Sequence, residues 1–418
     1  MSPQGKIVPL SFTGLLLVAL AASVARQIHA NGGRWTGTWA ASEQIPEPQN
    51  ALPPEDLRDA TLRQIFHVSI GGSLVRVRVS NAFGNEPLHF TAVHIARPLS
   101  PESPEIDPAT DKALAFSGSG DVTVPAGAEY VSDPVSYPLA PLSNIAVTFH
   151  LDDPPAGETA HPGSRETSYY IHGDLVAAAN LPGAKRVDHW FQISGIDVIA
   201  GRESRAIAVV GDSITDGHAS TTNGNDRWTD VLAERLHGFA ATRDVSVLNE
   251  GIGGNHLLTN GLGPNALARF DRDVLAQSGV RYVIILEGVN DLGDLTRLGE
   301  VPPEKHAEMV HRIIGTYGQM IARGHAAGIE VIGATILPYG GSTYYDPGPS
   351  SEADRREINE WIRARGHFDA VVDFDAVMRD PTRQDRLLAK YDSGDHLHPS
   401  IAGYRAMGSA VPLGFFQR

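Results

Sequence analysis

The chain has 418 residues, enough for two or three domains at roughly 100–200 residues per domain. Hydrophobic residues make up 42% and charged residues 20%, so the chain can bury a sizeable core, and a disordered or low-complexity protein is excluded. The formal charge of −15 repels phosphate backbones, which argues against nucleic acid as a partner. Cysteine is absent, which excludes disulfides, thiolate metal sites and a cysteine nucleophile.

Residues 1–25 have the layout of a secretory signal peptide. Lys6 precedes an apolar run over 7–20, and small residues ending at Ala25 follow, as at a cleavage site. Cleavage could also extend to Ala30, which offers a second small residue. An uncleaved anchor is the alternative, but proline and glycine interrupt the run and leave it short for a bilayer core about 30 Å thick. We expect a secreted or periplasmic protein without stable membrane insertion after cleavage.

From residue 34 to residue 198 the sequence is typical of short strands separated by proline and glycine. Over 74–80, valines alternate with Arg76 and Arg78, as in a half-buried strand, and the alternation recurs over 144–151. No stretch has the spacing of an amphipathic helix. We predict an all-β sandwich or jelly-roll domain over 34–198, with both arginines on its solvent face rather than at a ligand site.

After residue 201 the alternation gives way to apolar runs separated by stretches with helical spacing. Five such runs are predicted strands: 206–210, 245–248, 282–286, 329–334 and 370–374. Continuously apolar strands are covered on both faces, which indicates a parallel sheet. Gly324 and Gly328 are expected helix stops. We predict a flavodoxin-like, doubly wound α/β domain over 203–418, with ligands bound at the carboxyl ends of its strands.

Ser213 directly follows the first predicted strand of this domain, in the run GDSITDG. A serine hydroxyl needs a base to take its proton and a third group to orient that base. Asp395 stands three residues before His398, so in a turn its carboxylate can reach one imidazole nitrogen and leave the other for Ser213. Taken singly, Ser213 would be a turn serine and His398 a hydrogen-bonded loop histidine. Together with Asp395 they suggest a Ser-His-Asp triad.

A metal cluster of Asp395, His396 and His398 is an alternative interpretation of the same loop. No third histidine or carboxylate motif of recognised spacing supports it, so we expect neither a metal nor a cofactor.

Two further loops follow predicted strands and offer hydrogen-bond donors. One holds Gly253 and Gly254, and the other holds Asn290. A dinucleotide fingerprint beginning at Gly251 would need glycine where His256 stands. A glycine amide and the Asn290 side chain could instead stabilise the oxyanion of acyl transfer, at about 3 kcal/mol per donor. Ordinary loop glycines and a capping asparagine remain the alternative for either motif alone.

Four short runs, in order along the chain, resemble the conserved blocks of the SGNH (GDSL) hydrolases. They are GDSI at 211–214, GGN at 253–255, GVND at 288–291 and DHLH at 395–398. The resemblance implies that Ser213 is the nucleophile and that Asp395 and His398 complete the triad. It also implies that the Ser213 backbone amide, Gly254 and Asn290 are the oxyanion donors, with Gly253 as the neighbouring candidate for the glycine.

The run 212–228 is similar, more specifically, to secreted two-domain members of that family, a group that includes xylan-esterase-like enzymes. The stretch 62–84 resembles their amino-terminal β-domain more loosely. The leading hypothesis is a secreted serine esterase that removes short acyl groups, such as acetyl, from a small-molecule or polysaccharide ester through an acyl-enzyme. A GDSL lipase or lysophospholipase with the same triad is one alternative. A non-catalytic glycan-binding protein is another, although the intact set of five site residues argues against it.

Overall fold

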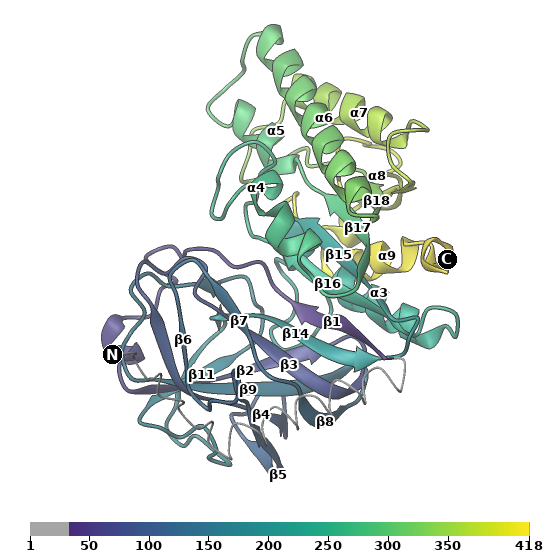
Figure 1. Ribbon diagram of the computed structural model, residues 1–418. Coiled ribbons are helices and arrows are strands. Elements are labelled where there is room, and N and C mark those ends of the chain that lie inside the picture. Colours follow the sequence, from purple (N-terminus) through teal and green to yellow (C-terminus); the bar gives the residue numbers. More distant parts are fainter. Residues whose placement is uncertain (1–32, 418) are drawn as a thin grey trace, which may run out of the picture.

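The computed structural model describes residues 33–417 (Figure 1). The predicted signal peptide lies outside this range. We call strands β1 (Arg34–Ala40) to β14 (Ile193–Ala200) the β half, and the chain from β15 (Arg205–Gly211) to η4 (Leu413–Phe416) the α/β half. No helix within 33–417 combines the length and the apolar character needed to cross a membrane.

Two antiparallel sheets and a short ribbon make up the β half. The first sheet has the order β1-β14-β3-β7, with β8 beside β3. Its strands not yet defined are β3 (Gly72–Ser80), β7 (Glu129–Val131) and β8 (Val135–Leu139). The second has the order β12-β11-β2-β9-β4-β5 with β6 beside β4. Its strands are β2 (Ala60–Val68), β4 (Leu88–Pro98), β5 (Ile106–Ala113), β6 (Val122–Val124), β9 (Ser143–Leu151), β11 (Ser168–His172) and β12 (Lys185–Val187). The ribbon pairs β10 (Ala160–His161) with β13 (Trp190–Phe191), and η1 (Pro54–Leu57) is a single helical turn.

The core of the β half lies between these sheets. The alternating valines of β3 are fully buried, and the rings of Trp39, Phe66 and Trp190 pack with centroids 4.3–5.5 Å apart. This confirms the predicted sandwich.

The expectation that Arg76 and Arg78 face solvent is wrong. Arg78 is only 6% exposed, and its guanidinium donates to Ser278 Oγ at 2.8 Å. Arg76 Nε donates to Asp197 Oδ2, also at 2.8 Å. Ser278 belongs to the α/β half, so this face of β3 is covered by the other half of the protein. Alternation identifies which side chains share a face of a strand, but not what covers that face.

A five-stranded parallel sheet forms the centre of the α/β half, in the order β16-β15-β17-β18-β19. Its remaining strands are β16 (Val245–Gly251), β17 (Val280–Leu286), β18 (Glu330–Ala334) and β19 (Ala370–Val372). This is the flavodoxin-like order, so the predicted fold is confirmed. Residue 374, predicted as the end of the last strand, instead begins helix α8 (Phe374–Met378).

Helices cover both faces of this sheet (Figure 1). On one side are α3 (Trp228–Gly238) and α9 (Ile401–Ala410), which pack together. On the other are α6 (Pro303–Ala326) and α7 (Pro349–Arg363), also in contact with each other. The shorter elements are α2 (Ser213–Asp216), α4 (Ala266–Phe270), η2 (Asp271–Leu275), α5 (Val289–Thr296) and η3 (Ala389–Tyr391).

Of the two predicted helix stops, only Gly328 lies beyond the end of α6. Its φ of 72° is left-handed, a conformation that glycine adopts without strain. Gly324 instead lies inside the last turn of α6 and is buried. A Cβ at this position would lie 2.5 Å from Val331 Cγ2, so glycine is needed here for close packing of the helix on the sheet.

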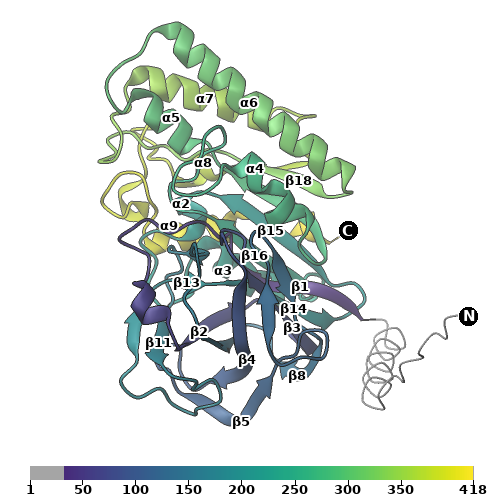
Figure 2. The ribbon, with the colours of Figure 1, turned by 60° about the vertical axis from the view of Figure 1, so that its left-hand side comes forward.

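The two halves meet along β1 and β16 (Figure 2). Gly37 N donates to Ser278 O at 2.8 Å, and Val247 N donates to Ser69 Oγ at 3.2 Å. Deeper in the interface, Ser42 Oγ donates to Asp273 Oδ2 at 2.6 Å and accepts from Arg269 Nη1 at 2.7 Å. Buried polar groups of the α/β half therefore find hydrogen-bond partners in the β half.

Glu43, beside this interface, is expected to make stability depend on pH. The side chain is 2% exposed, and burial raises its pKa from 4.5 to about 8. The unfolded chain releases this proton at a lower pH than the folded chain does. The contribution of Glu43 to the free energy of unfolding is therefore complete below pH 4.5 and is lost as the pH rises towards 8. In urea titrations, Glu43→Gln should be more stable than the wild type at pH 9, by about 1 kcal/mol or more, and should lose this advantage at pH 4.5. The exposed Glu86→Gln is the control; an equal gain at both pH values would contradict the prediction.

Candidate active site

A cavity of about 540 Å³ lies at the carboxyl ends of the parallel strands. The loops after β15, β16 and β17 contribute Ser213, Gly253, Gly254 and Asn290 to its wall, and His398 completes this side. The structure thus brings these sequence-predicted residues to one place, with Asp395 behind His398.

The turn after β15 presents Ser213 at the start of α2. Asp212 caps this helix, because its carboxylate accepts from Ile214 N at 2.9 Å. As the first helical residue, Ser213 has a backbone N–H without an acceptor inside the helix. A Cβ at Gly211 would lie 2.1 Å from Thr215 Oγ1, so the tight turn requires glycine before the helix. The Ser213 side chain is 8% exposed, at the cavity wall.

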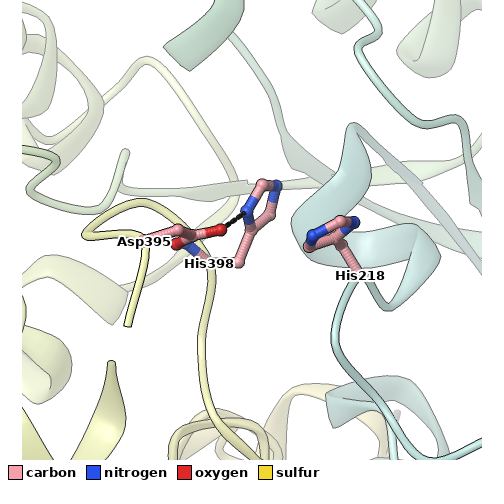
Figure 3. Close-up of side chains that lie close together, drawn as sticks. All are labelled: His218, Asp395 and His398. Carbon is pink, nitrogen blue, oxygen red and sulfur yellow. Dashed lines mark hydrogen bonds and ion pairs between the residues drawn. The ribbon is translucent and has the colours of Figure 1, made fainter. Parts of the chain in front are cut away.

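A chain of hydrogen bonds joins Ser213, His398 and Asp395. Ser213 Oγ lies 2.8 Å from His398 Nε2, and His398 Nδ1 lies 2.6 Å from Asp395 Oδ2 (the second contact is drawn in Figure 3). The other carboxylate oxygen accepts from the backbone N–H groups of Leu397 and His398, at 2.9 and 2.8 Å. Burial alone would raise the pKa of Asp395, but the hydrogen bonds from His398 outweigh it and hold this pKa well below its usual range. Asp395 is therefore ionised and orients the imidazole.

His218, which the sequence analysis did not single out, lies against the same imidazole. Its ring centroid is 4.0 Å from that of His398 (Figure 3), and the two rings are tilted by 37°. Burial, followed by the nearby charges of His398 and Arg165, lowers the pKa of His218 to about 4. Its ring is therefore neutral at pH 7, and its Nδ1 accepts a hydrogen bond from Arg165 Nη2 at 3.2 Å. No local pattern marks a lone histidine after the GDSITDG run as part of a site.

Three side chains of this cluster could offer ligands to a metal ion. The donor atoms of His218, Asp395 and His398 lie within 4.8 Å of one another. However, Ser213 and Asp395 already occupy the two nitrogens of His398, so a metal bound there would displace a hydrogen bond. His396, the remaining member of the alternative metal cluster, instead bonds Asp392 through Nδ1 at 2.5 Å.

Asn290 and Gly254, the predicted oxyanion donors, line the same cavity as Ser213. Asn290 is 2% exposed; its Nδ2 donates to Asn255 O at 2.7 Å, and its Oδ1 accepts from Tyr345 Oη at 2.6 Å. These bonds fix the carboxamide and leave its second N–H free to meet a ligand. Gly254 has a left-handed φ of 64°, which exposes its backbone at the cavity wall.

The β half also reaches this cavity, which the sequence did not predict. Its lining residues are Gln44, Glu47, Asn50, Pro162, Gly163 and Arg165. Buried His161 donates from Nδ1 to Ser42 O at 2.7 Å, and its Nε2 lies 2.9 Å from Asp216 Oδ1. A Cβ at Gly163 would lie 1.9 Å from Asp216 Oδ2, so only glycine leaves room for this carboxylate. Because Asp216 ends the helix that Ser213 begins, the β half supports the turn that carries the serine.

Residues 209–406, which include Ser213, Asp395 and His398, match the model of the GDSL-like lipase/acylhydrolase family. This region of the chain therefore belongs to that family, the SGNH hydrolases, as the sequence resemblance implied. The protein is a carboxylic ester hydrolase.

Solved structures similar to this chain cover about half of it. A G-D-S-L family protein from Desulfitobacterium hafniense DCB-2 is 25% identical over 50% of this chain and 97% of its own, with a TM-score of 0.36. The acetyl xylan esterase AlAXEase is 19% identical over 49% and 96%, with a TM-score of 0.37. A mutant of Axe2, an acetyl-xylooligosaccharide esterase from Geobacillus Stearmophilus, is 21% identical over 49% and 91%, with a TM-score of 0.35. No curated protein sequence matches the chain.

Proposed function

We propose that the protein is a serine esterase in which Ser213 is the nucleophile, His398 the general base and acid, and Asp395 the group that orients His398. The observation that carries this proposal is the continuous chain of hydrogen bonds from Ser213 Oγ through both imidazole nitrogens to an ionised carboxylate. This is the arrangement that activates a serine hydroxyl.

In this mechanism, His398 Nε2 takes the Ser213 proton as Oγ bonds to the ester carbonyl carbon. The negative charge that develops on the carbonyl oxygen is stabilised by the backbone N–H groups of Ser213 and Gly254 and by the free N–H of Asn290. When the tetrahedral intermediate collapses, the C–O bond to the alcohol breaks and the departing oxygen takes the proton from His398. Water then bonds to the acyl carbon as the same imidazole takes its proton. The C–Oγ bond breaks, Ser213 Oγ regains the proton from His398, and the acid is released.

Asn290→Ala is expected to lower kcat by about 10²–10³, with a much smaller effect on KM, because the lost donor acts on charge present only in the transition state. The measurement is hydrolysis of p-nitrophenyl acetate. Tyr345→Phe is the matched control, since it removes the bond that holds the Asn290 carbonyl and keeps the donor. Tyr345→Phe should lower kcat less than Asn290→Ala does. Equal falls in kcat for the two variants would argue against Asn290 as an oxyanion donor.

The substrate we propose is a short acyl ester of a carbohydrate, with acetyl as the acid. The cavity wall supports this substrate: Arg165 and the second N–H of the Asn50 amide offer donors to hydroxyl groups, and the Tyr344 ring stands edge-on to His398 with centroids 5.5 Å apart. A panel from acetylated xylan to long-chain p-nitrophenyl esters tests it. Acetate release from the polysaccharide, without turnover of long chains, is expected. Preferential cleavage of long chains would instead identify a lipase.

We also propose that residues 1–25 direct export and that the working enzyme is secreted or periplasmic. Support comes from the charged start, apolar run and small residues of this segment. Expression of the full chain with its own leader tests this, followed by fractionation and sequencing of the mature amino terminus. We expect a start at residue 26 or 31 in the medium or periplasm; an intact leader in the cytosol would contradict export.

A further inference from the structure

Arg165 is the cation of the β half that reaches the cavity holding Ser213 and His398. Its Nη2 donates to neutral His218, and its Nε is buried without a hydrogen-bond partner. Within residues 33–417, no carboxylate forms an ion pair with this guanidinium. Arginine binds carboxylates through the planar array of N–H donors on its guanidinium. A partly buried guanidinium that has no carboxylate partner can therefore bind an anion.

The backbone holds Arg165 in this position. Its φ of 50° is left-handed, which is uncommon for a residue with a Cβ. Asn223 of the α/β half donates from its backbone N to Arg165 O at 2.9 Å, and its side chain exchanges two hydrogen bonds with Thr167. Contacts between the two halves thus fix the loop that carries the arginine.

The acidic residues of the same wall are already engaged. Glu47 accepts from the side-chain amides of Gln44 and Asn50. Asp216 meets His161, and Asp294 meets His256 and Arg297. Arg165 thus differs from Arg297, the other arginine of the wall, in lacking a carboxylate partner.

Arg165 and the leaving group of the proposed reaction are both close to the paired imidazoles of His218 and His398. The departing alcohol oxygen takes its proton from His398 Nε2, so the alcohol must lie beside this imidazole. His218 packs on that ring, and Arg165 donates to His218. A group attached to the alcohol can therefore reach Arg165.

We infer that Arg165 makes the enzyme selective for esters whose alcohol carries a carboxylate near the esterified oxygen, as an acetylated sugar acid does. This inference rests on the proposed function and narrows its substrate from carbohydrate esters to acidic ones. The β half then supplies substrate selectivity to the catalytic half.

A matched pair of esters tests this: 3-carboxyphenyl acetate and the neutral, similarly shaped 3-carbamoylphenyl acetate. The readout is the ratio of their kcat/KM values, from acetate release. We expect the wild type to favour the carboxylate by roughly tenfold or more, and added salt to reduce this ratio. Arg165→Gln should bring the ratio close to one, and Arg165→Lys should keep part of it. Arg297→Gln is the control and should keep the wild-type ratio.

Binding to the Ser213→Ala variant, measured by calorimetry with the same two esters, separates this inference from the esterase function. Tighter binding of the carboxylate that disappears when Arg165→Gln is added supports the anion site, even if the wild type hydrolyses neither ester. Absence of hydrolysis of both esters by the wild type would overturn the esterase proposal but not the anion site. A wild-type ratio near one, or a preference that survives Arg165→Gln, would overturn the role of Arg165.

Discussion

Replacing Ser213 by alanine is expected to lower kcat for p-nitrophenyl acetate by roughly 10⁴ to 10⁶. The Oγ that bonds to His398 Nε2 is the only atom that changes, so the oxyanion donors and the His398–Asp395 pair remain in place. The remaining rate would come from water activated by His398 and from binding in the cavity. Because the loss is confined to the nucleophile, the substrate dissociation constant should change little.

The control for this variant is Ser220→Ala, seven residues further along the same segment and outside the cavity wall. A fluorophosphonate reagent gives a second measurement, since it attaches covalently to an activated serine. We expect the mass increase in the wild type and in Ser220→Ala, and none in Ser213→Ala. Labelling of Ser213→Ala, or its activity within about tenfold of the wild type, would place the nucleophile elsewhere.

Asp395→Asn should have the next largest effect, a fall in kcat of about 10⁴. The neutral carboxamide has nearly the same shape but cannot stabilise the imidazolium that forms when His398 takes the serine proton. It can also present an N–H to His398 Nδ1 and so favour the wrong tautomer. In the wild type, the hydrogen bonds from His398 keep the pKa of Asp395 well below its usual range. Mild acid therefore leaves this charge in place, and only substitution removes it.

Asp392→Asn provides the matched control, three residues earlier in the same loop. Asp392 bonds His396 and the backbone N–H groups of Gly394 and His396, and no hydrogen bond or ion pair joins its carboxylate to His398. We expect its kcat within about tenfold of the wild type, with any loss appearing in thermal stability. Equal losses in the two variants would mean that Asp395 acts only by shaping the loop.

The residues of the proposed triad could be located from the sequence because each one depends on local order along the chain. Ser213 follows a buried strand directly, and Asp395 and His398 share one turn. Parallel strands bring their carboxyl ends to one edge, which places Ser213 there. His398 lies beyond the last strand, β19, so its approach to Ser213 is an expectation from the loop spacing and the family resemblance rather than from the order of strands. The structure brings Ser213 Oγ and His398 Nε2 to 2.8 Å, in accordance with that expectation.

The contribution of the β half to the site could not be predicted in this way. Arg165 reaches the cavity, and His161 reaches Asp216 in its wall, because one folded half packs on the other, and no periodicity within either segment encodes that contact. The same reason explains the error at Arg76 and Arg78. On β3 the valines face the core between the two β sheets, and the arginines lie on the other face of the strand. The α/β half packs on that second face and covers it.

The hydrogen bonds of Ser42 with Asp273 and Arg269 have a consequence for how the protein unfolds. A fragment starting at residue 203 would lose this hydroxyl, the imidazole of His161 and the cover over β16, so Asp273, Arg269 and Asp216 would each lose a hydrogen-bond partner. The two halves should thus melt together in a single cooperative transition. Replacing the β half by that of a homologue should give a stable protein only when the replacement carries residues equivalent to Ser42 and His161.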